Sequence, residues 1–134
     1  GLAGQQEGDH ALVSELLSLM KQHQLDYTNT FNAFTESLVR DFAIDSQLKG
    51  WVSKWRLRTS SESYSTMRAV NPAVIPRNHN IEMILAEYEQ TAQSVSLDEF
   101  MKVIKAPYKY EEQFAAWYQP PKEGDCNYQT FCGT

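Results

Sequence analysis

The stretch from Asn71 to Arg77 constrains the fold more than any other part of the chain, because it places two prolines, Pro72 and Pro76, between segments with helical periodicity. Proline lacks a backbone N–H and pushes the residue before it out of the α region. The backbone should therefore be extended here. Residues 73–75 between the prolines are all apolar, which an exposed linker would not need. We predict a buried extended segment at 71–77, called the crossing below.

Periodic apolar residues and capping residues predict helices on both sides of the crossing. Asp9, Asp26 and Asp45 are suited to be N-caps, because a carboxylate there accepts a hydrogen bond from a free backbone N–H. Ser96 and Glu99 form a capping-box pattern. The expected helices lie at about 10–24, from 26 to about 38, from 45 to about 55, from Asn78 or Asn80 to about 92 and at 97–105, with a short last one at 111–118. Between the third and the fourth, a loop or helix break at 59–63 is followed by a helical rhythm at 64–68.

These elements predict an all-α fold, an irregular helical domain of four to six helices with an extended C-terminal tail over 122–134. Only two residues, Gln24 and Leu25, separate the first two helices. A connection this short favours an antiparallel helical hairpin. We therefore expect those two helices to be neighbours.

Length and composition predict a single helical domain over 1–134. Hydrophobic residues make up 42% of the chain and charged residues 22%, which is typical of a soluble globular protein. No apolar run approaches the ~20 residues of a membrane span, and the sequence does not open on a signal-peptide pattern with a basic start and an apolar centre. We expect an intracellular protein with no membrane partner, cytoplasmic if the protein is bacterial and mitochondrial if it is eukaryotic. The chain begins at Gly1 without a methionine, which fits a fragment of a longer protein; the alternative is a whole protein that has lost its first residues.

Charge is unevenly distributed along the chain. The net charge is −5 over residues 1–48, +5 over 49–77 and −5 over 78–134. The basic middle could attract an anionic partner. The alternative, which we favour, is that its cations pair with acidic helices of this domain or of a longer parent. No basic-aromatic signature supports a nucleic-acid partner. The cations of this basic band are Lys49, Lys54, Arg56, Arg58, Arg68 and Arg77.

The sequence contains no pattern that predicts a catalytic or cofactor-binding site. The sequence has neither the glycine-rich loop of dinucleotide-binding proteins nor the P-loop of nucleotide-binding proteins. It also lacks the catalytic-loop and metal-binding motifs of kinases. His10, His23 and His79 are too scattered for a metal site. His79 is more plausible as a residue that ties down the crossing by hydrogen bonds than as a base. The residues predicted to have a structural role at the crossing are Asn71, Pro72, Pro76, Arg77, Asn78 and His79.

Two cysteines, Cys126 and Cys132, lie in the predicted tail. Thiols in an intracellular protein favour redox exchange over a structural disulfide. We do not expect the two to bond to each other, because the residues between them favour an extended chain that would hold them apart. Cys126 is interpreted as an ordinary tail thiol.

Four short motifs carry a resemblance to a known family. They are Asp-Tyr-Thr-Asn-Thr-Phe at 26–31, Asn-Pro-Ala-Val-Ile-Pro-Arg-Asn-His at 71–79, Ala-Pro-Tyr at 106–108 and Thr-Phe-Cys-Gly-Thr at 130–134. Together they span most of the chain. The chain resembles the C-terminal part of the selenoprotein O (YdiU-like) family, in which a kinase-like fold transfers AMP from ATP to protein hydroxyls.

The resemblance implies that this chain is the non-catalytic C-terminal fragment of a larger kinase-like protein adenylyltransferase. ATP and magnesium would be bound by the full-length parent, upstream of these residues. The fragment would buttress the kinase-like body, and protein substrates would be partners of the parent. Cys132 stands where the family carries selenocysteine or cysteine, which implies a redox residue that can bond to a cysteine of the body and regulate it. The competing hypothesis is a free-standing helical interaction module that uses the basic band.

Overall fold

The computed structural model describes residues 1–121, and the predicted extended tail lies outside them. The all-α prediction is confirmed, since residues 1–121 form helices and connecting segments without a strand. The elements, in chain order, are α1 (Asp9–Gln22), α2 (Tyr27–Glu36), the 3-10 helix η1 (Ser46–Leu48), α3 (Lys49–Arg56), α4 (Ser63–Arg68), α5 (Asn78–Thr91), α6 (Val95–Ile104) and the 3-10 helix η2 (Glu112–Tyr118).

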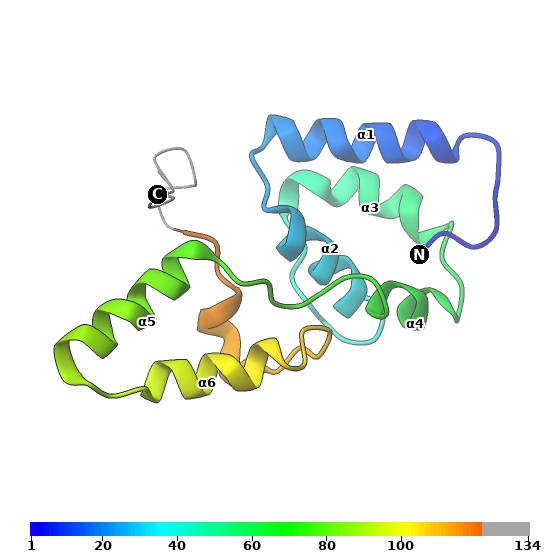
Figure 1. The fold of residues 1–134 in the computed structure, drawn as a ribbon. Helices are drawn as coiled ribbons and strands as arrows, with labels where there is room; N and C mark the ends of the chain where they lie inside the picture. The colour runs from blue at the N-terminus through cyan, green and yellow to red at the C-terminus, as the bar shows by residue number, and fades with distance from the viewer. Residues whose placement is uncertain (122–134) are drawn as a thin grey trace, which may run out of the picture.

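Helices α1 to α4 with η1 form one group, called the N-terminal bundle (Figure 1). Aromatic side chains fill its centre. The ring of Phe34 lies with its centroid 5.1 Å from that of Trp51 and 5.2 Å from that of Trp55. Large rings bury much apolar surface, so this cluster is the main source of hydrophobic stabilisation in the bundle. The other buried residues of this core are Leu16, Met20, Leu48 and Met67.

Two of the predicted helix caps are confirmed. The side chain of Asp26 accepts a hydrogen bond of 2.8 Å from the N–H of Asn29 at the start of α2. Asp45 accepts one of 2.8 Å from the N–H of Gln47 and begins η1, which continues into α3. The cap predicted at Asp9 is off by one residue, because the N-cap of α1 is Gly8 with φ 94°.

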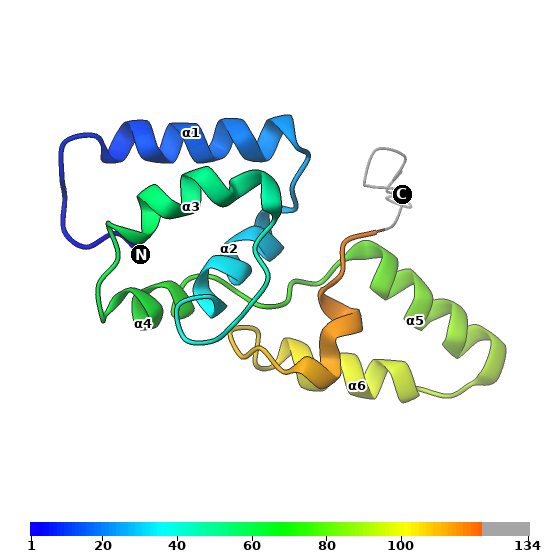
Figure 2. The ribbon, with the colours of Figure 1, turned by 180° about the vertical axis from the view of Figure 1, so that it is seen from behind.

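The predicted hairpin of the first two helices is wrong. Helix α1 lies along α3, and α2 runs across to pack against α4 (Figures 1 and 2). The indole N–H of Trp51 donates to the carbonyl of Leu12 at 2.8 Å and so joins α3 to α1. The indoles on α3 pack in one core with Leu16 and Met20 of α1, while α2 packs against α4.

Helices α5 and α6 with η2 form a second group, called the C-terminal unit, with a separate core (Figure 1). The side chain of Asn80 donates to the carbonyl of Trp117 at 3.2 Å, and the indole N–H of Trp117 donates to Glu99 at 2.8 Å. These bonds hold η2 against both helices. The buried residues of this core are Val74, Ile84, Phe100, Val103, Trp117 and Tyr118.

Both helices of the C-terminal unit begin differently from the sequence prediction. Helix α6 begins at Val95 with Ser94 as its N-cap, so the predicted capping box at Ser96 is not formed. Glu99 instead accepts the hydrogen bond from Trp117. The N-cap of α5 is Arg77 rather than an asparagine. Glu99 of the predicted box and Asn80, one of the two asparagines predicted as caps, are both bonded to Trp117 instead.

The crossing connects the two groups and is buried, as predicted. Ala73 and Val74 are only 1% and 2% exposed. Their N–H groups both donate to the carbonyl of Pro107, at 2.7 and 3.3 Å. Since the crossing is non-helical, buried at its middle and bonded there to the segment after α6, it works as a packed element of the fold. In the described part of the chain, no helix has both the length and the apolarity of a membrane span.

Candidate functional site

The predicted structural residues of the crossing contribute unequally. The side-chain amide of Asn71 donates to the hydroxyl of Thr35 at 3.0 Å. Pro72 is half-buried, whereas Pro76 and Asn78 are exposed. Within residues 1–121, the side-chain hydrogen bonds that hold the start of α5 come from Arg77 and Asn80, and none comes from the half-buried His79.

Arg77 anchors the end of the crossing to α2. It is 8% exposed, and its two terminal nitrogens donate to the two carboxylate oxygens of Asp26, each at 2.8 Å. This two-point geometry is the strongest that a guanidinium and a carboxylate can form. Partial burial alone would raise the pKa of Asp26, but the hydrogen bonds from Arg77 and from the N–H of Asn29, with the charge of Arg77, lower that pKa below its usual 3.8. Asp26 therefore caps α2 and fixes the crossing at once.

Arg68 anchors the beginning of the crossing. It donates at 2.6 Å to the buried carboxylate of Glu36 and at 2.9 Å to the side-chain oxygen of Asn32. Another of its nitrogens donates to the backbone carbonyl of Asn71. Arg40 approaches the second oxygen of Glu36 at 2.5 Å. One buried carboxylate is thus shared by two guanidinium groups, which compensates the charge that burial would otherwise penalise.

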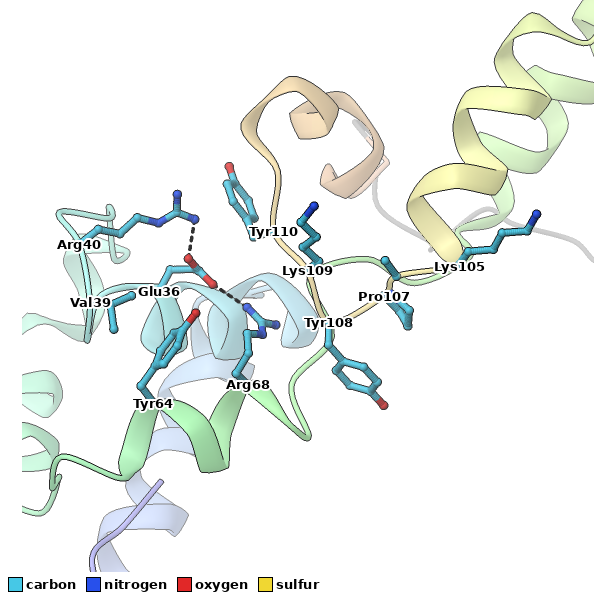
Figure 3. A pocket seen from close by; sticks show the side chains of 11 residues that line it. Glu36, Val39, Arg40, Tyr64, Arg68, Lys105, Pro107, Tyr108, Lys109 and Tyr110 are labelled. Atoms are coloured by element: carbon cyan, nitrogen blue, oxygen red, sulfur yellow. Dashed lines mark hydrogen bonds and ion pairs between the residues drawn. The ribbon is translucent and has the colours of Figure 1, made fainter.

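A cavity of about 760 Å³ opens beside this cluster, between α2, α4 and the segment after α6 (Figure 3). We call it the tyrosine–arginine groove. Figure 3 shows Glu36 held between Arg40 and Arg68, with Tyr64 and Tyr110 beside them. The guanidinium of Arg40 also lies over the ring of Tyr110, 4.6 Å from its centroid. The lining residues are Glu36, Val39, Arg40, Tyr64, Arg68, Lys105, Ala106, Pro107, Tyr108, Lys109 and Tyr110.

The lining of the tyrosine–arginine groove is rich in tyrosine and cationic side chains. It offers cations and tyrosine hydroxyls, and its single carboxylate, Glu36, is already paired. Among these lining residues there is neither a thiol nor an imidazole, so the groove does not contain the Ser–His or Cys–His pair typical of hydrolases. Within residues 1–121, no group of three or more His, Cys, Asp and Glu side chains is arranged to hold a metal ion. The groove is thus lined by cationic, tyrosine and aliphatic side chains.

Known proteins show what this chain is similar to. It matches no family model. It is 52% identical over 134 residues to the protein nucleotidyltransferase YdiU of Pseudoalteromonas translucida (strain TAC 125), a match that covers the whole chain and 28% of that relative. It is 39% identical over 142 residues to YdiU of Geobacillus kaustophilus (strain HTA426) and 36% identical over 140 residues to YdiU of Anoxybacillus flavithermus (strain DSM 21510 / WK1), each match covering 29% of the relative.

This chain is a YdiU homologue. The predicted relationship to the selenoprotein O (YdiU-like) family is confirmed. The chain spans less than a third of the length of the curated relatives that it matches. That partial coverage is consistent with the predicted fragment of a longer protein.

Three of the four family motifs meet at the crossing of this YdiU homologue. Asp26 of the first motif holds Arg77 of the second, and the carbonyl of Pro107 in the third accepts the N–H groups of Ala73 and Val74. The sequence indicated the motifs one by one but could not show that they touch. The fourth motif contains Cys132, which, like Cys126, lies outside the described residues.

Most cations of the basic band are paired with groups of this chain. Four of its cations pair with carboxylates of this chain: Lys54 with Glu15, Arg58 with Asp9, Arg68 with Glu36, and Arg77 with Asp26. Arg56 donates to the carbonyl of Ser37 at 3.2 Å. The interpretation that these cations serve the fold of this domain is confirmed for the four pairs. The sequence missed the individual partners because each pair joins residues far apart in the chain.

Proposed function

We propose that this chain is the non-catalytic helical part of a YdiU-type protein nucleotidyltransferase. In the full-length protein, a kinase-like body would bind ATP and magnesium and transfer AMP to serine, threonine or tyrosine hydroxyls of protein substrates in the cytoplasm. The helical part would buttress that body and carry a redox-regulatory cysteine, Cys132. The observation that carries the proposal is the 52% identity, over the whole chain, with a relative named as a protein nucleotidyltransferase.

The geometry of the crossing supports a buttressing role. Its N–H groups are bonded to the segment after α6, and Arg68 and Arg77 fix its two ends to α2. A connector held in this way keeps two helical groups at a constant relative position. Such a body can present a fixed surface to a larger partner domain, and the tyrosine–arginine groove beside the crossing is a surface of suitable chemistry.

Transfer of a labelled AMP group tests the activity. The full-length protein and the isolated 134-residue chain should each be incubated with magnesium and an ATP analogue that carries a detectable adenine. We expect the full-length protein to label itself or an added protein substrate, and the isolated chain to label neither. Labelling by the isolated chain would place the chemistry inside it, and absence of labelling by the full-length protein would remove the proposed activity.

Substitution of the cysteines tests the redox role. The transfer rate of the full-length protein should be measured after mild oxidation and again after reduction with dithiothreitol. We expect the wild-type rate to change between the two conditions and the Cys132→Ser rate to stay constant. Cys126→Ser is the matched control, because it removes the other thiol of the chain, and it should behave as wild type. A redox response that survives in Cys132→Ser would contradict the assignment.

A further inference from the structure

A second hollow, separate from the tyrosine–arginine groove, lies between α1, α2 and the end of α4. We call it the apolar groove; its volume is about 460 Å³. Its floor includes the buried rings of Phe34, Trp51 and Trp55. Its rim includes Val13, Leu17, Tyr27 and Val70, which are 44 to 66% exposed. Large apolar side chains at the rim of an apolar hollow are typical of an interaction site.

The apolar groove exists because α1 and α2 do not form a hairpin. Helix α3 covers the side of α1 that carries Leu16, whereas Val13 and Leu17 on the same helix remain exposed. On α2, Tyr27 lies against Phe31 with ring centroids 4.6 Å apart and is itself largely exposed. The two helices therefore turn apolar side chains toward a gap that no described residue fills.

The side chains that line the apolar groove restrict which chemical groups can bind in it. None of the lining side chains is ionised. The amide of Asn71 is already bonded to Thr35 at 3.0 Å. Burial of a charged or strongly polar group here would leave it without partners, which is costly. The groove therefore fits aliphatic or aromatic side chains.

We propose that the apolar groove receives an apolar segment from the remainder of the full-length YdiU-type protein. This inference deepens the buttressing role of the proposed function and rests on it. The curated relatives are more than three times as long as this chain, which covers 28 to 29% of them. A segment of the same polypeptide has a high effective concentration at the groove. A second copy would instead have to offset the entropy lost on association.

Site-specific photo-crosslinking in the full-length protein tests the occupant. A benzophenone amino acid should be placed at Leu17 or Tyr27, with Leu57 of the same bundle as control because it is 87% exposed and lies outside the apolar groove. We expect irradiation at Leu17 and Tyr27 to give crosslinks, mapped by mass spectrometry, to residues of the same polypeptide outside these 134. A dimer-sized product, or no more crosslinking than at Leu57, would overturn the proposal.

Charge substitution provides a second measurement. Leu17→Glu should lower the melting temperature of the full-length protein while leaving that of the isolated 134-residue chain nearly unchanged. Leu57→Glu should leave both unchanged. An equal shift in the full-length protein and in the isolated chain would show that Leu17 serves only the bundle, and would overturn the proposal. Neither measurement uses AMP transfer, so crosslinks in an inactive protein would retain the docking surface while the proposed activity failed.

Discussion

The N-terminal bundle and the C-terminal unit each bury a hydrophobic core, but the residues that fill the two cores come from different kinds of element. In the bundle, helices bring their own aromatic residues into the core, where Phe34, Trp51 and Trp55 contact one another. In the C-terminal unit, the two α-helices depend on the crossing and on η2 for part of their core. Val74 comes from the crossing and Trp117 from a 3-10 turn.

This difference indicates that the C-terminal unit is less able than the N-terminal bundle to fold stably by itself. A pair of helices buries too little apolar surface to be stable alone, and part of the apolar face of α5 remains exposed, at Ile81, Leu85 and Tyr88. The unit needs the crossing for its core and for its attachment to the bundle. We therefore expect the two regions to unfold together, and the following substitutions test that coupling.

Val74→Asp should have the largest effect. Val74 is 2% exposed in the C-terminal core, and an unpaired buried charge costs about 3–5 kcal/mol. The free energy of unfolding should be measured by urea denaturation, with hydrogen exchange reporting on the bundle and the C-terminal unit separately. We expect both regions to lose protection together.

Val70→Asp is the matched control for this experiment, because Val70 precedes the crossing and is 66% exposed. It should change the stability of the isolated chain by no more than about 0.5 kcal/mol. If Val74→Asp left the bundle fully protected, the two regions would be independent domains joined by a tether.

Arg77→Met should have the next largest effect, since it removes the anchor between the crossing and α2. Loss of one partner of a buried pair costs about 3–5 kcal/mol, but the side chain of Asp26 is 24% exposed, so solvent screening reduces the expected loss to roughly 2–3 kcal/mol. Lys54→Met breaks the far more exposed pair with Glu15 and should cost less than about 1 kcal/mol. Equal losses in the two variants would show that the crossing is not anchored by its ion pair.

The pair of Arg77 and Asp26 also predicts that the free energy of unfolding depends on pH. The pKa of Asp26 in the folded chain lies below the 3.8 of the free side chain. A lowered carboxyl pKa stabilises the fold above the unfolded value, and this contribution is lost as pH falls through the folded value. The stability difference between wild type and Arg77→Met should therefore shrink below about pH 4. Urea denaturation at pH 7 and pH 3 measures it; a constant difference would show that Arg77 acts through packing alone.

Glu99→Ala should have a smaller effect, confined to the C-terminal unit. It removes the acceptor of the 2.8 Å hydrogen bond from the Trp117 indole, which is worth about 1 kcal/mol. The NMR shift of the Trp117 indole proton should move, while those of Trp51 and Trp55 stay in place. Glu89→Ala, at an exposed position of α5, is the control and should move none of them.

Ser96→Ala should have the smallest effect. The sequence assigns Ser96 to a capping box, whose loss would cost about 1 kcal/mol, whereas the structure begins α6 at Val95. We expect a change below about 0.5 kcal/mol. Asp45→Ala, at a cap that is formed with a 2.8 Å bond, should cost about 1 kcal/mol. A loss at Ser96 as large as that at Asp45 would restore the sequence prediction.

What the sequence predicted correctly is what short-range chemistry determines. The caps at Asp26 and Asp45 and the extended crossing follow from neighbours in the chain, because N-caps and prolines act within a few residues. The prediction of a hairpin between α1 and α2 was wrong because the tryptophans of α3 pack against α1. The pairing of Arg77 with Asp26, 51 positions away, carries no local signal, so neither the anchor nor the two grooves could be anticipated.

The long separation of Arg77 and Asp26 along the chain also affects when their contact forms during folding. Helices form from local contacts, whereas a contact between residues 51 positions apart requires a long loop to close first. We expect the crossing to be locked late, after the transition state, so that its interactions govern how long the folded chain survives. In stopped-flow experiments, Arg77→Met should then accelerate unfolding several-fold and leave the refolding rate almost unchanged. The crossing would set the lifetime of the native state while contributing little to the speed with which that state is reached.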